Sequence, residues 1–341
     1  MDRSKKNRTR LAIGILIGVL CIYLAFRKVE LDQLWKAFGQ ANYWYLLPAA
    51  AAIFLSHFLR AFRWRYLLDP VRRLDTGSLF SALIIGYAAN TVMPAHLGEF
   101  LRAFVLSKRR QMSMSPVFAT VIVERIIDVF SLLVLMVLAV FVHPFPDWVI
   151  ESGYIMFAGT LGLFVFLIFL KKATSQTLRL IGPVLRLLPK TFERKVEATL
   201  ERFLAGIVPL RRWHDYITVG FLSMIIWLSY GLVFYSCIHA FDFENAYQLT
   251  WSASLILLVI TTIAVVVPSS PGYVGTYHYL CQISLGIFGV PAGPALSFAF
   301  VVHAANVLPV FLVGLFLAHR EGVAILRTSE EASEIEESVS V

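Results

Sequence analysis

Long apolar segments separated by short charged loops recur along most of the chain, and they constrain its fold more than any other feature. The chain has 341 residues, of which 58% are hydrophobic and only 15% are charged, whereas soluble domains carry about 25% charged residues. A segment that crosses lipid finds no water for its backbone polar groups, so it spans as a helix with internal hydrogen bonds. The sequence therefore predicts an all-α polytopic membrane protein.

Six apolar segments are expected to be full spans, and they cover residues 11–26, 46–68, 117–142, 154–170, 217–240 and 295–318. Residues 79–107 and 250–289 are also apolar, but each stretch is interrupted by proline and glycine. We expect each of them to form a pair of broken helices, either re-entrant or spanning, because proline removes a helical hydrogen bond. The protein would then have six to eight transmembrane helices.

Three segments are expected to lie outside the membrane. Residues 1–10 form a basic tail before the first anchor, which we interpret as uncleaved because no small-x-small cleavage site follows it. Residues 171–212, after the span within 143–170, carry apolar residues at helical spacing and predict an amphipathic helix at the membrane surface. Residues 321–341 are acidic and are expected to be disordered.

The distribution of the 30 Lys and Arg residues predicts the orientation of the chain. Most of them fall in segments that share one side of the membrane, namely 1–10, 60–76, 108–110, 171–212 and 319–341. Cytoplasmic loops are enriched in Lys and Arg, so both termini are expected in the cytoplasm of a multi-pass protein of the inner membrane. With such a hydropathy, the net charge of +8 indicates anionic lipid headgroups as partners and not nucleic acid.

The two interrupted segments resemble each other. Pro94 and Gly98 interrupt the first, Pro268 and Gly272 interrupt the second with Pro271 between them, and both have the pattern Pro-x-x-x-Gly. The spans that precede them would cross the membrane in opposite directions. This arrangement predicts two inverted repeats, 44–142 and 213–320, with a site between the interrupted helices as in many transporters.

Ionisable and polar residues inside the apolar segments are the candidate site, because charge in the hydrocarbon region is costly and is usually functional. The candidate substrate-binding residues are Arg60, Arg63, His96, Glu99, Arg102, Glu124, Arg125, Asp128, His303 and Asn306. Among them, Glu99 and Arg102 are three residues apart on one helix, as are Arg125 and Asp128, so each pair can interact.

These residues also have purely structural interpretations. Arg60 and Arg63 can snorkel to the inner headgroups together with Arg65. The acidic and basic residues of 124–128 can lock helices together as an ion-pair cluster, and His303 and Asn306 can be interhelical hydrogen-bond donors. In the functional interpretation, the surplus of arginines binds an anion that carries a phosphate, because the planar guanidinium donates two hydrogen bonds at once.

The motifs resemble a known family. The residues that carry the resemblance are Arg60-x-x-Arg63-Trp64, Asn90-x3-Pro94-x3-Gly98-Glu99-x2-Arg102, Glu124-Arg125-x2-Asp128 and Pro268-Ser-Ser-Pro271-Gly272. Over about residues 10–320 the chain is similar to the flippase-like family, also named for the transmembrane region of lysylphosphatidylglycerol synthase. This chain has His96 where members of the family often have arginine.

The resemblance implies a membrane protein that moves an aminoacylated phospholipid between leaflets, and relatives in isoprenoid-lipid or glycolipid pathways leave the lipid open. Because the sequence has no room for the soluble synthase domain, we expect a separate lipid-modifying enzyme as a partner. Two alternatives to a translocase remain: a membrane-embedded headgroup or glycosyl transferase, and a scaffold that does not transport. We expect no cofactor and no metal, since no phosphate-binding glycine loop or zinc spacing is present.

Overall fold

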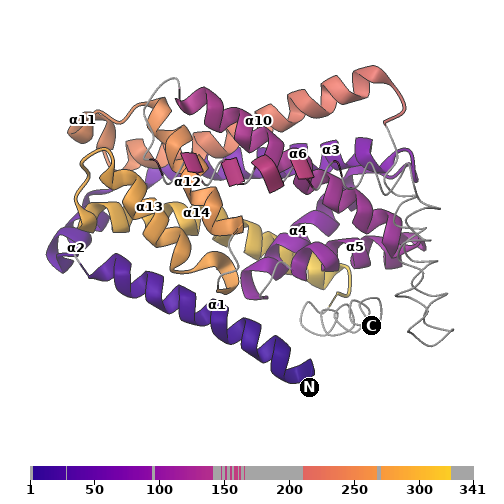
Figure 1. The fold of residues 1–341 in the computed structure, drawn as a ribbon, viewed down its shortest axis with the longest axis horizontal. Coiled ribbons are helices and arrows are strands. Elements are labelled where there is room, and N and C mark those ends of the chain that lie inside the picture. Colours follow the sequence, from indigo (N-terminus) through magenta and orange to yellow (C-terminus); the bar gives the residue numbers. More distant parts are fainter. Residues whose placement is uncertain are drawn as a thin grey trace.

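In a computed structural model of the protein, the structure describes residues 3–27, 29–93, 97–140, isolated positions between 147 and 165, 210–266 and 270–323. Within these ranges all regular elements are helical (Figure 1), which confirms the predicted all-α fold class. The helices and the 3₁₀ turns η1 and η2 are α1 (Arg3–Phe26), α2 (Leu31–Gln40), η1 (Tyr43–Tyr45), α3 (Leu46–Leu68), α4 (Thr76–Val92), α5 (Leu97–Arg110), α6 (Met114–Val140), α10 (Trp213–Ala240), α11 (Phe243–Tyr247), α12 (Trp251–Val266), η2 (Pro271–Tyr273), α13 (Thr276–Gly286) and α14 (Ala292–Arg320).

Three described helical segments are long and apolar enough to cross a membrane, namely Tyr43–Leu68, Trp213–Ala240 and Ala292–Arg320. Helix α6 has 27 residues and carries the charged positions 124, 125 and 128. The expected span 154–170, the amphipathic helix within 171–212 and the acidic tail lie outside the described residues, apart from isolated positions and their ends. The first helix begins at Arg3 and so includes most of the expected basic tail, because lysine and arginine are good helix formers.

Helices α3 and α10 run antiparallel along their length. At one end, Asn42 N–H donates a 2.7 Å hydrogen bond to the carbonyl oxygen of Ala240. At the other end, Arg211 Nε lies 3.3 Å from Asp69 Oδ2. The opposite directions expected for these two spans are therefore observed.

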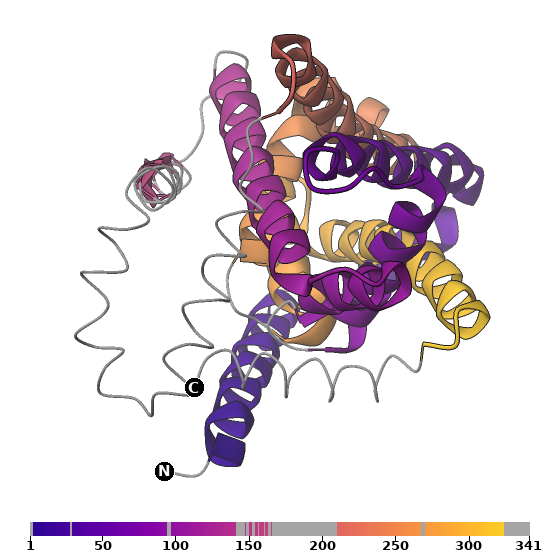
Figure 2. The same ribbon diagram turned by 90° about the vertical axis from the view of Figure 1, so that its right-hand side faces the viewer.

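The main contacts between α-helices in the first predicted repeat have corresponding contacts in the second, as expected for two related halves. Helix α3 packs on α4 as α10 packs on α12, and the α4–α5 and α5–α6 contacts match those of α12–α13 and α13–α14. Across the halves, α4 packs on α14 as α12 packs on α6. This pairing supports the inverted repeat, whose boundaries and axis stay predictions. Helix α1 lies outside the pairing: it contacts α13 and η2, and its first turns project from the bundle (Figure 2).

The first break is closed by a side-chain cap and by two glycines. Helix α4 ends at Val92 and α5 begins at Leu97, so the helix is interrupted where the sequence predicts it; Pro94 and His96 lie outside the described residues. The side-chain oxygen Oδ1 of Asn90 accepts a 2.8 Å hydrogen bond from Gly98 N–H. A Cβ atom at Gly98 would collide with the carbonyl oxygen of Gly86 and lie 2.6 Å from Asn90 Oδ1. Asn90 therefore satisfies a backbone donor that the start of α5 leaves unpaired.

The second break lies against the first. Helix α12 ends at Val266, and η2 follows with Gly272 at φ +64°; Pro268 is outside the described residues. A Cβ atom on Gly272 would be 3.2 Å from the carbonyl oxygen of Thr91, at the end of α4. The carbonyl oxygen of Gly272 is in turn 2.8 Å from His303 Nε2 on α14. The two interruptions, far apart in sequence, thus meet inside the bundle.

The glycine contact in the first break gives a testable prediction. Gly98→Ala should destabilise the protein by about 1–3 kcal/mol, because the added methyl group has no room against the backbone of α4. Gly39→Ala is the matched control, since Gly39 is an exposed helical glycine with no neighbour within 4 Å of an added Cβ atom. It should be neutral or slightly stabilising. Thermal unfolding in detergent measures both, and an unchanged midpoint for Gly98→Ala would contradict the close contact.

Candidate functional site

Helix α6 places two carboxylates on one face in the interior of the bundle. Glu124 and Asp128 are one helical turn apart, and they are 0% and 5% exposed. A buried carboxylate is stable only when it is paired and hydrogen-bonded, because it has lost its hydration. The partners of these two residues therefore decide what the site is.

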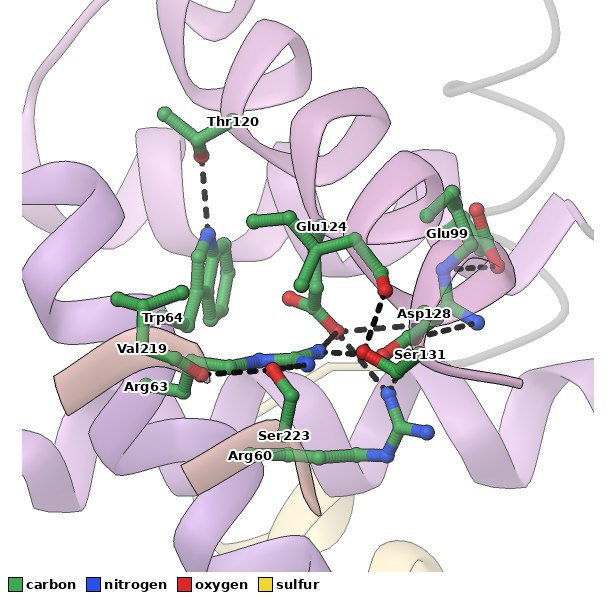
Figure 3. Close-up of polar contacts among 12 residues, drawn as sticks. Arg60, Arg63, Trp64, Glu99, Thr120, Glu124, Asp128, Ser131, Val219 and Ser223 are labelled. Atoms are coloured by element: carbon green, nitrogen blue, oxygen red, sulfur yellow. Dashed lines mark hydrogen bonds and ion pairs between the residues drawn. The ribbon is translucent and has the colours of Figure 1, made fainter. Parts of the chain in front are cut away.

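Two arginines of α3 bind Asp128 (Figure 3). Arg60 Nη1 lies 2.5 Å from Asp128 Oδ2, and Arg63 Nη2 lies 2.6 Å from Asp128 Oδ1, so each carboxylate oxygen receives one guanidinium. Arg60 and Arg63 also approach Glu124 Oε1, at 3.4 Å and 3.6 Å. Both arginines are buried. The snorkelling interpretation is therefore wrong for these two, whereas Arg65 is exposed.

A third arginine comes from α5, just after the first break. Arg102 Nη2 lies 3.2 Å from Glu124 Oε2, and the Arg102 guanidinium is 4.8 Å from the centre of a Trp64 ring. Trp64 Nε1 donates a 2.9 Å hydrogen bond to Thr120 Oγ1 on α6. Cation–π stacking of this kind stabilises a guanidinium that has been removed from water.

Helix α10 supplies neutral partners that the sequence did not single out. Arg63 Nη1 donates a 2.8 Å hydrogen bond to Ser223 Oγ, and Arg60 Nε donates a 3.3 Å hydrogen bond to the Tyr230 hydroxyl. Serine and tyrosine are common in apolar helices, so no local pattern marks these two positions. The charged cluster, defined as Arg60, Arg63, Glu99, Arg102, Glu124, Arg125 and Asp128, thus joins α3, α5, α6 and α10.

One edge of the charged cluster is open. Arg125 Nε lies 3.2 Å from Glu99 Oε1, and these side chains are 33% and 20% exposed, whereas the carboxylates of Glu124 and Asp128 are at most 7% exposed. Arg125 also lies 3.2 Å from Glu124 Oε1, and its Nη2 donates a 3.4 Å hydrogen bond to the hydroxyl of Tyr87. The spacing of Glu99 and Arg102 predicted that these two residues pair. In the structure Glu99 pairs with Arg125 instead, because the packing of α5 on α6 places Arg102 beside Glu124.

Of the remaining candidates, His303 and Asn306 contact groups outside the charged cluster. His303 contacts the carbonyl oxygen of Gly272 at the second break, and its ring centre is 4.8 Å from that of His278. Asn306 Nδ2 donates a 2.7 Å hydrogen bond to the carbonyl oxygen of Val302 on its own helix, and no bond from it to another helix is observed among the described residues. His96 is outside the described residues. Within the described part of the chain, no group of three or more His, Cys, Asp or Glu residues could hold a metal ion.

Comparison with known proteins identifies the family. The family described as "Lysylphosphatidylglycerol synthase TM region" matches residues 11–314. The chain belongs to this family. A UPF0104 membrane protein of Methanothermobacter thermautotrophicus is 24% identical over 307 residues, which are 85% of this chain and 89% of that protein. A UPF0104 membrane protein of Methanocaldococcus jannaschii is 23% identical over 336 residues, 92% of this chain and 96% of that protein.

A third relative carries an enzyme name. The glycosyltransferase AglD of Haloferax volcanii is 29% identical over 127 residues. The match covers 37% of this chain and only 20% of that protein. The family comparison thus shows a membrane protein of the lysylphosphatidylglycerol synthase transmembrane-region family, and it agrees with the apolar helices of the structure.

The ion pairs of this family member can be tested by paired substitutions. Arg102→Ala should lower the stability by about 3 kcal/mol, because Glu124 loses a buried partner. Adding Glu124→Gln should recover part of this loss, whereas adding Glu99→Gln should recover none, because Glu99 pairs with Arg125. Thermal unfolding of the three variants gives the comparison. Recovery by Glu99→Gln, without recovery by Glu124→Gln, would overturn the pairing described here.

Proposed function

We propose that this chain translocates a membrane lipid with an anionic, phosphate-bearing headgroup, and that Arg125 binds the headgroup. The observation that carries the proposal is the open edge of the charged cluster. Arg125 is the partly exposed arginine of a cluster whose other three arginines are buried against two carboxylates. Four arginines face three acids in it, so the charged cluster as a whole carries one surplus positive charge.

The three buried arginines of the charged cluster are already paired with carboxylates of α6. Arg60 and Arg63 each place one nitrogen within 2.6 Å of Asp128, and Arg102 stacks on Trp64 while it contacts Glu124. Their role in the proposal is to hold Glu124 and Asp128, which in turn orient Arg125. Arg125 itself contacts Glu124 at 3.2 Å and Asp128 at 3.6 Å. In the proposal a phosphate displaces Glu99, whose side chain is 20% exposed, and the Arg125 guanidinium donates hydrogen bonds to the phosphate in its place.

The position of Arg125 also supports transport. Glu99 belongs to the first turn of α5, immediately after the first break, and Tyr87 lies on α4, five residues before that helix ends at Val92. The second break packs on the end of α4 at Thr91. In transporters built from inverted repeats, substrates bind where interrupted helices meet, because the helix ends there offer unpaired backbone groups. Arg125 therefore lies next to the region where such a site is expected.

The alternative functions have less support. A transferase would use Glu99, Glu124 or Asp128 as a general base, but each of these carboxylates is held by one or more arginines. The enzyme name of the Haloferax relative belongs to a protein of which the match covers a fifth. The family name supports a lipid-handling membrane protein. We further propose that the protein lies in the inner membrane with both termini in the cytoplasm, and that a separate enzyme modifies its lipid.

The proposal predicts that transport is lost in a variant that still folds. In proteoliposomes that contain the purified protein, Arg125→Ala should abolish the movement of fluorescent phosphatidylglycerol between leaflets. Because Arg125 also pairs with Glu124, the variant should lose some stability, so the rate is measured at a temperature at which thermal unfolding shows that the variant is folded. Arg125→Lys should restore only part of the rate, because lysine keeps the charge but loses the bidentate contact. Dithionite quenching of the outer-leaflet fluorophore measures the rate.

Arg73→Ala is the matched control, since Arg73 is 76% exposed and pairs only with Asp69 among the described acidic residues. It should move lipid at the wild-type rate. Wild-type transport by Arg125→Ala would contradict the role of this residue. A wild-type protein that moves no anionic lipid faster than empty vesicles do would contradict the function itself.

A further inference from the structure

A cavity with basic lining residues lies at one end of the bundle, and it is separate from the charged cluster. It has a volume of about 670 Å³, within the range of small-molecule sites. The start of α4, the end of α5 and the end of α14 form its walls. These three helix ends belong to the segments that the Lys and Arg distribution places on the cytoplasmic side. None of its lining residues belongs to the charged cluster.

Basic residues outnumber acidic ones around this cavity. Lys108, Arg109 and Arg320 line it, together with Asp75 and Glu321. The two acids hold arginines in place: Arg109 Nη1 lies 2.5 Å from Glu321 Oε1, and a neighbouring arginine, residue 110, contacts Asp75. Lys108 and Arg320 are exposed and add their charge at the mouth. The cavity therefore attracts anions.

The rest of the lining is apolar. Phe80, Phe104, Val105 and Leu317 face the same space, and the Lys108 ammonium is 5.5 Å from the centre of the Phe104 ring. A small inorganic anion gains nothing from contact with apolar side chains. A lipid can place its phosphate among basic residues and its glycerol and acyl carbons against apolar ones. The combination of the two linings indicates an amphiphile.

We propose that this cavity binds the phosphate-bearing headgroup of an anionic lipid of the cytoplasmic leaflet, with Lys108 and Arg320 as its principal contacts. The lipid enters between the ends of α5 and α14, and its phosphate meets the basic mouth while the upper part of its chains lies along Phe104 and Leu317. This site is separate from Arg125, and its occupation does not depend on transport.

Native mass spectrometry of the full-length protein, ejected from phosphatidylcholine nanodiscs with and without phosphatidylglycerol, tests the proposal. The measurement is made in the wild type and in Arg125→Ala, so that a lipid at the charged cluster does not contribute in the second case. In the Arg125→Ala background, Lys108→Ala with Arg320→Ala should lower the retention of phosphatidylglycerol by about thirtyfold, since each basic residue at a membrane surface contributes about 1 kcal/mol. In the wild-type background the loss should be smaller, because lipid bound at the charged cluster remains. Arg73→Ala, an exposed arginine that does not line the cavity, should retain the lipid as the wild type does.

Four results would overturn the proposal. In the Arg125→Ala background, the variant with Lys108→Ala and Arg320→Ala retains phosphatidylglycerol as Arg125→Ala itself does, or phosphatidylcholine is retained equally well, or added inorganic phosphate displaces the lipid, which would make the cavity a site for a soluble phosphate. Loss of retention in Arg125→Ala alone would place the bound lipid at the charged cluster and would also contradict it. The two experiments measure different properties, lipid retention and lipid transport. A negative result for retention at the cavity therefore does not contradict transport through Arg125, and a negative transport result does not contradict lipid binding at the cavity.

Discussion

Two carboxylates buried in the interior of a membrane bundle constrain the rest of this structure. Glu124 and Asp128 have almost no access to solvent, and an unpaired charge there would cost about 3–5 kcal/mol. Their partners come from α3 and α5, and neutral groups of α10 accept further hydrogen bonds from Arg60 and Arg63. The charged cluster therefore fixes how these helices pack, and it leaves Arg125 and Glu99 as its one open edge among the described residues.

The interrupted helices determine where the open edge of the charged cluster lies. Asn90 caps α5 across the first break, and the glycine at position 98 lets α5 approach the backbone of α4. The second break contributes Gly272, whose backbone packs on Thr91 and whose carbonyl oxygen contacts His303. The two breaks meet close to a charged cluster of four arginines and three acids, and this arrangement is compatible with the anionic ligand that we propose.

Much of this could be predicted from the sequence, because the membrane leaves a chain few options. Apolar length predicts helices, the proline and glycine pattern predicts both breaks, and the cost of charge in lipid singles out all seven members of the charged cluster. The pairing within the cluster could not be predicted. Spacing along one helix favours Glu99 with Arg102, but the contact of α5 with α6 decides for Arg125. Ser223 and Tyr230 carry no local signal, because their role depends on the antiparallel contact of α3 with α10.

The central claim is that an anionic headgroup reaches Arg125 inside the bundle. Photo-crosslinking with an anionic lipid whose headgroup carries the reactive group tests it most directly, with peptide mapping of the labelled protein. We expect label in the peptides around Tyr87 and Arg125, and we expect unlabelled lipid to compete with it. Label confined to the lipid-facing surface, such as Phe221 on α10, which is 65% exposed, with none near Arg125, would contradict it.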